Sequence, residues 1–225
     1  MTLVKEHSRS VSTNQSGVHR DLERIVGRHL KAPWQKPINR HTQGAFARIR
    51  EWVDDEQCSL IVDSCCGDGE STRVLARQFS TSKIIGVDKS AARLGRGANR
   101  LDPIANCLMV RADVNDFWRL IVAAKWRVSQ HYILYPNPYP KAAHLRKRWY
   151  GSPALPVLVA MGGSLVVRSN WKTYIEEFSL ALKVAGVASS WQQIEAEDPM
   201  TSFERKYAAS GQALWQLNAA LPVRD

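Results

Sequence analysis

Apolar and polar residues alternate along this chain in blocks that predict short buried strands separated by amphipathic helices. Apolar runs predict strands at Leu60–Asp63, Ile84–Asp88, Cys107–Val110, Tyr132–Tyr135, Ser164–Arg168, Val184–Ser189 and Ala213–Asn218. Helical spacing predicts helices at Ser71–Phe79, Ala91–Asn99, Phe117–Ala124, Pro153–Ala160 and Trp171–Leu182. Strands that alternate with helices form an α/β fold, here a mostly parallel seven-stranded sheet with helices on both faces. The last two strands have no helix of ordinary length between them, which predicts an antiparallel edge.

The chain before this alternating region divides into two parts. Residues 1–18 are polar and lack periodic apolar positions, which predicts a flexible N-terminal arm. Residues 19–56 hold two stretches with helical spacing, Asp21–Leu30 and Thr42–Val53, with Pro33 and Pro37 between them. They are expected to form a helical cap on a single domain that comprises residues 57–225.

Composition narrows the class of protein and its partners. No apolar run approaches the roughly 20 residues of a membrane span, and no signal peptide is evident, so a cytoplasmic protein is expected. The four cysteines lack zinc-binding spacing, which predicts reduced thiols and no metal. The formal net charge of +10 favours a polyanionic partner, with nucleic acid first and an anionic membrane surface second.

Three acidic residues follow three successive predicted strands. Asp63 ends the first strand and precedes a turn with Gly67 and Gly69, Asp88 ends the second, and Asp113 follows the third. Glycines allow the backbone to approach a ligand closely, and acids at these places can bind an amino-acid group, a ribose and an adenine amine in turn. Each acid alone is equally consistent with a helix N-cap. The ordered set of three predicts a Rossmann-like fold that binds a nucleoside-containing cofactor.

A second group of polar residues follows the fourth predicted strand. In Pro136-Asn-Pro-Tyr-Pro-Lys141, three prolines in five residues hold the backbone extended and fix the directions of the side chains between them. The cluster that follows mixes basic and aromatic side chains, namely Lys141, His144, Arg146, Lys147, Arg148, Trp149 and Tyr150. Such a mixture favours contacts with RNA phosphates and bases, although a solvated basic helix start would have the same composition.

These segments together resemble the tRNA (guanine-N7-)-methyltransferase family. The family's Pro-Asp-Pro-Trp-Pro-Lys segment corresponds to residues 136–141, and its Gly-x-Gly-Glu corresponds to the glycine turn with Glu70. Ser169-Asn-Trp-Lys-Thr-Tyr174 and Thr201-Ser-Phe-Glu-Arg205 resemble two further motifs of that family. The resemblance covers about residues 58–218. It implies S-adenosylmethionine as cofactor, held by the three acids, and methylation of guanine N7 in tRNA.

The resemblance also implies the residues that bind the substrate. These are Lys141, Arg146, Arg148, Asn170, Thr201, Phe203 and Glu204, with Asn137 as the catalytic residue. Asn137 and Asn170 both stand where the family has aspartate, and both are expected to face the target base. Tyr139 replaces the family's tryptophan, and Cys65 stands where the usual methyltransferase loop has a further glycine, which predicts a tighter or reshaped loop.

Other functions fit some of the same residues. Asn137-Pro-Tyr139 resembles the Asn-Pro-Pro-Tyr turn of amino methyltransferases, which predicts methylation of an exocyclic amine on a nucleobase as one alternative. A second alternative is an RNA-binding paralogue that has kept the fold and lost most of the reaction, a reading favoured by the two asparagines. Methylation of a small molecule fits the charge poorly. The oligomeric state does not follow from the sequence.

Overall fold

The protein is built on one seven-stranded sheet, seen in a computed structural model that describes residues 8–32, 34–53, 59–98 and 103–222. The strands are β1 (Leu60–Ser64), β2 (Lys83–Asp88), β3 (Cys107–Arg111), β4 (Val128–Leu134), β5 (Gly163–Ser169), β6 (Ser189–Ile194) and β7 (Leu214–Leu221). Their order across the sheet is β3-β2-β1-β4-β5-β7-β6. Strand β7 runs antiparallel to both of its neighbours, β5 and β6, and the pairs among β1 to β5 are parallel, so the mostly parallel sheet with an antiparallel edge is confirmed.

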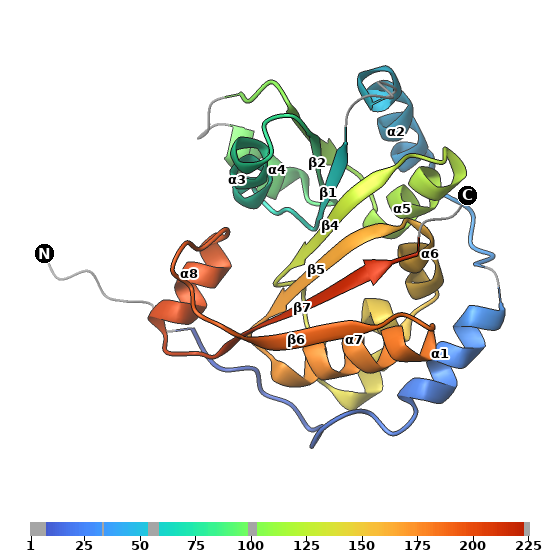
Figure 1. Cartoon of the computed structure of the whole chain (residues 1–225), viewed down its shortest axis with the longest axis vertical. Helices are drawn as coiled ribbons and strands as arrows, with labels where there is room; N and C mark the ends of the chain where they lie inside the picture. Colours follow the sequence, from blue (N-terminus) through green and yellow to red (C-terminus); the bar gives the residue numbers. More distant parts are fainter. Residues whose placement is uncertain (1–7, 33, 54–58, 99–102, 223–225) are drawn as a thin grey trace, which may run out of the picture.

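Helices cover both faces of the sheet (Figure 1). They are α1 (Leu22–Lys31), α2 (Arg40–Val53), α3 (Glu70–Gln78), α4 (Ala91–Ala98), α5 (Val114–Ala123), α6 (Ala154–Ala160), α7 (Lys172–Val184) and α8 (Ser202–Ala209), with 3-10 turns η1 (Ala142–Lys147) and η2 (Trp149–Gly151). The larger apolar core lies under α1, α2, α5, α6 and α7, and the smaller one lies under α3 and α8. The Rossmann-like α/β architecture expected from the sequence is therefore present.

Two predictions near the carboxyl end are wrong. The strand predicted at Val184–Ser189 is instead the end of α7, which Gly186 terminates at φ +77°, followed by β6 from Ser189. The stretch between the last two strands holds α8, which the sequence did not predict. Both errors have the same cause. A short segment has too few apolar residues to distinguish the 3.6-residue period of a helix from the continuous apolar run of a strand.

The residues before the sheet pack onto the main domain. Helices α1 and α2 form as predicted, and Leu22 and Val26 are fully buried in the larger core. Residues 8–18 do not stand free as the expected flexible arm, because Val11 packs against the core and the Ser8 amide donates to the Ser210 hydroxyl at 2.9 Å. Figure 1 shows this segment running from the region of α8 to α1. Residues 1–7 of that arm, and residues 54–58 at the expected domain boundary, lie outside the described residues.

A buried ion pair joins separate segments of the chain. Arg148 follows η1 and Glu177 lies on α7, and both side chains are fully buried. The Glu177 carboxylate accepts hydrogen bonds from Arg148 Nη1, from the Tyr150 hydroxyl at 2.6 Å, from Gln15 Nε2 at 2.6 Å and from the His19 amide at 2.7 Å. Fully bonded charges of this kind satisfy the requirement for burying an ionised group.

Among the described residues, no helix has the length and apolar character needed to cross a bilayer.

We expect Glu177→Ala to lower the free energy of unfolding by about 3–5 kcal/mol, because it leaves the Arg148 charge buried without its partner. Glu176→Ala is the matched control: Glu176 pairs with Lys172 at 3.4 Å on the surface, and such pairs contribute about 0–1 kcal/mol. Urea unfolding followed by circular dichroism measures both variants. Equal losses in the two variants would contradict a central role for the buried pair.

Candidate active site

The candidate residues gather at one edge of the sheet because parallel strands place their carboxyl ends together. Asp63 is the last but one residue of β1, Asp88 ends β2, and Asp113 follows β3. The turn with Asn137 follows β4, and Asn170 follows β5. The five neighbouring parallel strands thus bring the predicted cofactor residues and both asparagines to the same side of the molecule.

Asp63 carries an unpaired oxygen in a buried place. The residue is 1% exposed, and its Oδ2 accepts hydrogen bonds from the Ser71 hydroxyl at 2.6 Å and the Thr72 hydroxyl at 2.7 Å. Its Oδ1 has no hydrogen-bond partner in the described part of the chain. Burial raises the pKa of Asp63 to about 6, although the two hydroxyl groups oppose this shift. A buried acceptor without a partner is a natural place for a ligand's donor group.

The loop after β1 keeps the shape that glycines would give it. Gly67 and Gly69 have φ of +64° and +81°, and Cys65, at the position of the further glycine, has φ of +63°. The Cys65 amide donates to the Val87 carbonyl at 2.8 Å, which anchors the turn to β2. A side chain at such a φ costs about 1–3 kcal/mol, so the surrounding contacts retain this loop against local strain. Cys65 therefore adopts the glycine-like conformation itself.

The other two acids already have roles within the fold. Asp88 is 1% exposed and accepts from the Gly67 amide at 3.1 Å and the Ser90 amide at 2.8 Å, and it pairs with Arg93 at 3.1 Å. Asp113 is exposed, and its Oδ1 caps α5. Asp113 is therefore the N-cap of α5, as one of the two interpretations of the sequence expected. Because its side chain is exposed, it is also accessible to a ligand.

The turn between β4 and η1, residues 135–141, is held in an unusual conformation and is called the substrate turn below. Tyr135 and Tyr139 have φ of +49° and +45°. Asn137 is exposed, and its Oδ1 accepts from the Tyr139 amide at 3.2 Å. Lys141 and Arg146 are also exposed, as the sequence analysis requires for contacts with a polyanion.

Arg148 differs from the expectation of a phosphate-binding residue. Its guanidinium lies inside the protein, paired with Glu177 and 4.9 Å from the centre of the Trp171 ring. It donates to the Tyr139 carbonyl at 3.1 Å and 3.2 Å and to the Lys141 carbonyl at 3.2 Å. Its charge is therefore satisfied by the protein, and its contact is with the back of the substrate turn.

The residues after β5 and in α8 also make internal contacts. Asn170 Nδ2 donates to Gln212 Oε1 at 2.8 Å. Thr201 caps α8 by accepting from the Glu204 amide at 3.0 Å. Glu204 is 1% exposed and bonds Arg168 at 2.7 Å and the Met200 amide at 3.1 Å, so its carboxylate supports α8 rather than facing solvent. Phe203 is 49% exposed and available for contact.

Sequence reasoning missed the link between α8 and the cofactor loop. Arg205 makes a two-pronged ion pair with Glu70, both contacts at 2.7 Å, and so joins α8 to the first turn of α3. Both residues belong to motifs quoted above, which was the available signal. Glu177 and Gln15 were also missed, and nothing in their local sequence marks them.

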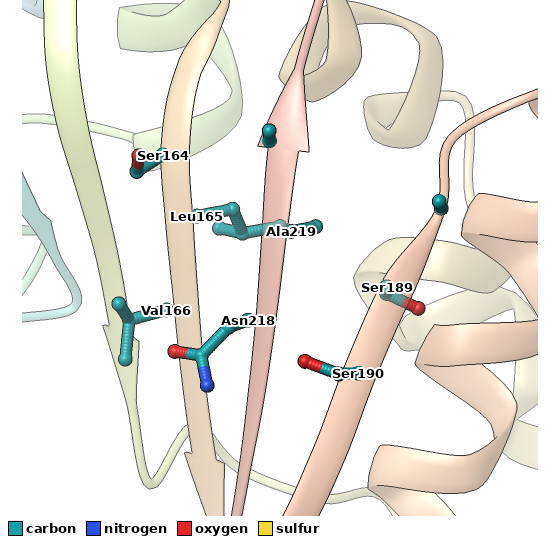
Figure 2. Close-up of a pocket in the computed structure, with 9 residues that line it drawn as sticks. Ser164, Leu165, Val166, Ser189, Ser190, Asn218 and Ala219 are labelled. Carbon is teal, nitrogen blue, oxygen red and sulfur yellow. The ribbon is translucent and has the colours of Figure 1, made fainter.

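A metal-binding cluster or a surface depression would be another kind of candidate site in the described part of the chain. No group of three or more His, Cys, Asp or Glu side chains among the described residues has the arrangement of a metal site. A shallow depression of about 570 Å³ lies over β5, β7 and β6 and is lined by Ser164, Val166, Ser190, Asn218 and small neighbours (Figure 2). It lies at the amino end of β5, and its lining has no ionisable side chain, so it does not supply the chemistry of a site.

Solved structures with a similar fold are methyltransferases. The 16S rRNA methyltransferase KamB has a TM-score of 0.56 and 19% identity, covering 84% of this chain and 99% of that one. A variant of the 16S rRNA (adenine(1408)-N(1))-methyltransferase from Catenulisporales acidiphilia, solved with the cosubstrate SAM, has a TM-score of 0.55 and 18% identity, covering 81% and 92%. At these identities the comparison establishes the fold.

Curated relatives are similar in sequence over most of the chain. The tRNA (guanine-N(7)-)-methyltransferase of Treponema pallidum is 26% identical over 164 residues, which are 70% of this chain and 65% of the relative. The protein of the same description from Bordetella pertussis is 25% identical over 208 residues, 87% of this chain and 76% of the relative. These matches confirm the resemblance to that family.

A family model described as "Putative methyltransferase", Methyltransf_4, matches residues 57–217. This range contains the glycine loop, the three acids, the substrate turn and α8. With the fold and the carboxyl-edge geometry in agreement, the chain belongs to this putative methyltransferase family, Methyltransf_4.

Proposed function

We propose that this protein methylates N7 of a guanine in tRNA. The observation that carries the proposal is the arrangement of one sheet edge, where a buried unpaired carboxylate oxygen of Asp63 lies on the same side as a rigid turn that exposes Asn137 and Lys141. The relatives named tRNA (guanine-N(7)-)-methyltransferase support the choice of acceptor.

The residues at the ends of β1, β2 and β3 fit S-adenosylmethionine. The free Oδ1 of Asp63 can accept from the cofactor's amino group, and the loop at Gly67 and Gly69 lets the backbone approach it closely. Asp88 would bind the ribose and Asp113 the adenine amine, each beside its present contacts. When bound, the cofactor supplies an electrophilic methyl group. The chain's own task is to orient the acceptor toward it.

Guanine N7 suits a site without an ionised base. The N7 lone pair is already nucleophilic and neutral, so alignment alone can supply much of the acceleration, about 7–11 kcal/mol in well-oriented systems. Asn137 and Asn170 provide amide groups for orientation but no negative charge. Replacing a charged acceptor by an amide weakens a base contact by about 1–3 kcal/mol. The proposal therefore predicts a slow but genuine enzyme.

Exposed basic residues beside the turn provide the phosphate contacts. Lys141, Arg146 and Lys147 are exposed on or next to η1, and Lys147 lies 5.9 Å from the centre of the Tyr139 ring. Arg148 is excluded from this set because it is buried. The formal net charge of +10 extends attraction for RNA beyond these contacts.

A second candidate is methylation of an exocyclic amine on a nucleobase. Two neutral amides at the positions of the family's aspartates favour it, because an amide oxygen can accept a hydrogen bond from an amine N–H without stabilising a charge. The Asn137 Oδ1 already accepts from the Tyr139 amide, which leaves one lone pair for such a contact. The identity of the methylated nucleoside distinguishes the two candidates.

We expect the affinity for S-adenosylmethionine to rise with pH and to level off above about 6, because the cationic cofactor favours ionised Asp63, whose pKa is about 6. Below that pH the affinity should fall by up to about tenfold per unit. Isothermal titration calorimetry between pH 5 and pH 8 (roughly one unit below to two above the Asp63 pKa) measures the dependence. Asp63→Asn should bind weakly with a flat profile, whereas the exposed control Asp198→Asn should match the unaltered protein. A flat profile in the unaltered protein would remove Asp63 from the cofactor site.

In the protein without cofactor, the free energy of unfolding should change with pH in the direction opposite to the cofactor affinity. Because the folded state holds the Asp63 proton more tightly than the unfolded chain does, the free energy of unfolding should fall as the pH rises from about 4 to about 6. Asp63→Asn should lose this component of the pH dependence.

Incubation with total tRNA and isotopically labelled S-adenosylmethionine, followed by nucleoside mass spectrometry, tests the reaction. We expect label in 7-methylguanosine, and a rate that rises about ten- to hundredfold in Asn137→Asp as the charged acceptor returns. Asn218→Asp is the control for the same chemical change, since it lies in the depression of Figure 2 and can keep its contact with Gln216.

Other outcomes of that assay have distinct meanings. Label in an amine-methylated base would favour the second candidate. No label from either protein, despite cofactor binding, would overturn the tRNA assignment and leave an RNA-binding role. Label from the Asn137→Asp variant alone would mean that the natural chain has lost this reaction.

Replacing a phosphate-contacting lysine should weaken tRNA binding evenly across tRNA sequences. We expect Lys141→Ala or Lys147→Ala to reduce the slope of log K against log salt by about one each, because each removes one phosphate contact. Arg77→Ala is the control and should leave the slope unchanged. Arg77 is exposed in the last turn of α3, at the end of that helix away from the glycine loop. Filter binding over a series of salt concentrations measures the slope, and an unchanged slope in the lysine variants would place the RNA elsewhere.

A further inference from the structure

Three consecutive residues near the N-terminus contact the substrate turn, the first residue after it, or the buried Arg148 behind it. Residues 8–19 are called the strap here. The Thr13 hydroxyl donates to the Pro140 carbonyl at 2.5 Å. The Ala142 amide donates to Asn14 Oδ1 at 3.0 Å, and Arg148 Nη2 donates to Gln15 Oε1 at 3.0 Å. These contacts span more than 120 residues of sequence, so they are tertiary contacts and not a local turn.

Hydrogen bonds from Arg148 and Thr13 reach three consecutive carbonyl groups of the substrate turn. Arg148 donates to the carbonyls of Tyr139 and Lys141, and Thr13 donates to the Pro140 carbonyl between them. Gln15 helps to fix the position of the Arg148 guanidinium, because its side-chain amide bridges Arg148 and Glu177. Every carbonyl from residue 139 to residue 141 is therefore bonded by the strap or by the buried arginine that the strap touches.

The substrate turn needs such support because its own backbone offers little. Pro136, Pro138 and Pro140 have no N–H to donate, so the turn cannot form a ladder of its own hydrogen bonds. Tyr135 and Tyr139 have left-handed backbone conformations, which persist only when the surroundings enforce them. Within the turn the Tyr139 amide donates to Asn137 Oδ1, and contacts from outside the turn add to the restraint on this residue.

The beginning of the strap reaches the second asparagine. Gln212 Nε2 donates to the Ser8 carbonyl at 2.9 Å, which fixes the orientation of the Gln212 amide. Its Oε1 then accepts from Asn170 Nδ2 at 2.8 Å. An aspartate at position 170 would have no proton to donate there. Asparagine at position 170 can therefore make the hydrogen bond that links it, through Gln212, to the strap.

We propose that the strap positions the groups that orient the acceptor base: Thr13, Asn14 and Gln15 hold the substrate turn, and Ser8 holds Asn170 through Gln212. This inference rests on the proposed function for the identity of the acceptor. Thr13, Asn14 and Gln15 are positioning residues, since they act through Asn137 and Lys141. A strap that only stabilised the fold would affect stability and leave turnover per folded molecule unchanged.

The test compares Thr13→Val, which removes the hydroxyl at nearly constant shape, with Thr13→Ser, which keeps it. Gln15→Met removes the bridging amide at nearly constant length, and Ser16→Ala alters an exposed residue of the same segment as the control. For each full-length variant, kcat and KM for tRNA, the Kd for S-adenosylmethionine and the thermal midpoint are measured. Hydrogen–deuterium exchange of the peptide that contains residues 137–148 is a readout that does not need activity.

We expect kcat to fall about tenfold in Thr13→Val and Gln15→Met, with faster exchange in the peptide and an unchanged cofactor Kd. Thr13→Ser should restore kcat and slow exchange, and Ser16→Ala should match the unaltered protein. Unchanged exchange in Thr13→Val and Gln15→Met would overturn the proposal, as would faster exchange with unchanged kcat.

The exchange readout separates this inference from the proposed function. If the unaltered protein methylates no tRNA, the proposed function fails, and faster exchange in the variants would still support restraint of the turn by the strap. Unchanged exchange would overturn the strap inference whatever the substrate is.

Discussion

The buried pair of Arg148 and Glu177 is the interaction on which the arrangement of the substrate side depends. Two charges removed from water are stable only when their hydrogen-bonding groups are met, and here the partners come from the N-terminal segment, the turn after β4, η2 and α7. Satisfying one pair therefore fixes the relative position of four parts of the chain. The substrate turn is one of them, so its geometry is a consequence of core electrostatics.

The cofactor side depends on a different constraint, the shared direction of parallel strands. Because β1, β2 and β3 end at one edge, the acids at their ends gather there without long-range side-chain networks. Asp63 shows the energetic consequence: its burial raises its pKa, and its unpaired oxygen is left for a partner that the fold does not provide. This burial lowers the free energy of unfolding at pH values where Asp63 is ionised.

The Arg205–Glu70 pair connects these two sides. It joins α8, which carries the Thr201–Glu204 motif, to the helix that begins at the cofactor loop. The pair is partly exposed, so it contributes little to stability by itself. It fixes the position of α8 relative to the glycine loop at the start of α3, through two residues from separate sequence motifs.

The sequence by itself determined the alternating fold, the acids at the strand ends, the glycine turn and the proline-stiffened motif, because each depends on periodicity or on neighbours in the chain. Only the tertiary structure decided that Arg148 is buried, that Cys65 takes a left-handed conformation, that α8 exists and that residues 8–18 cross the molecule. The reason is physical: a basic residue in a basic cluster is indistinguishable from its neighbours until its partner is placed. For Arg148 that partner is Glu177, 29 residues away on α7, where no sequence motif indicates the pairing.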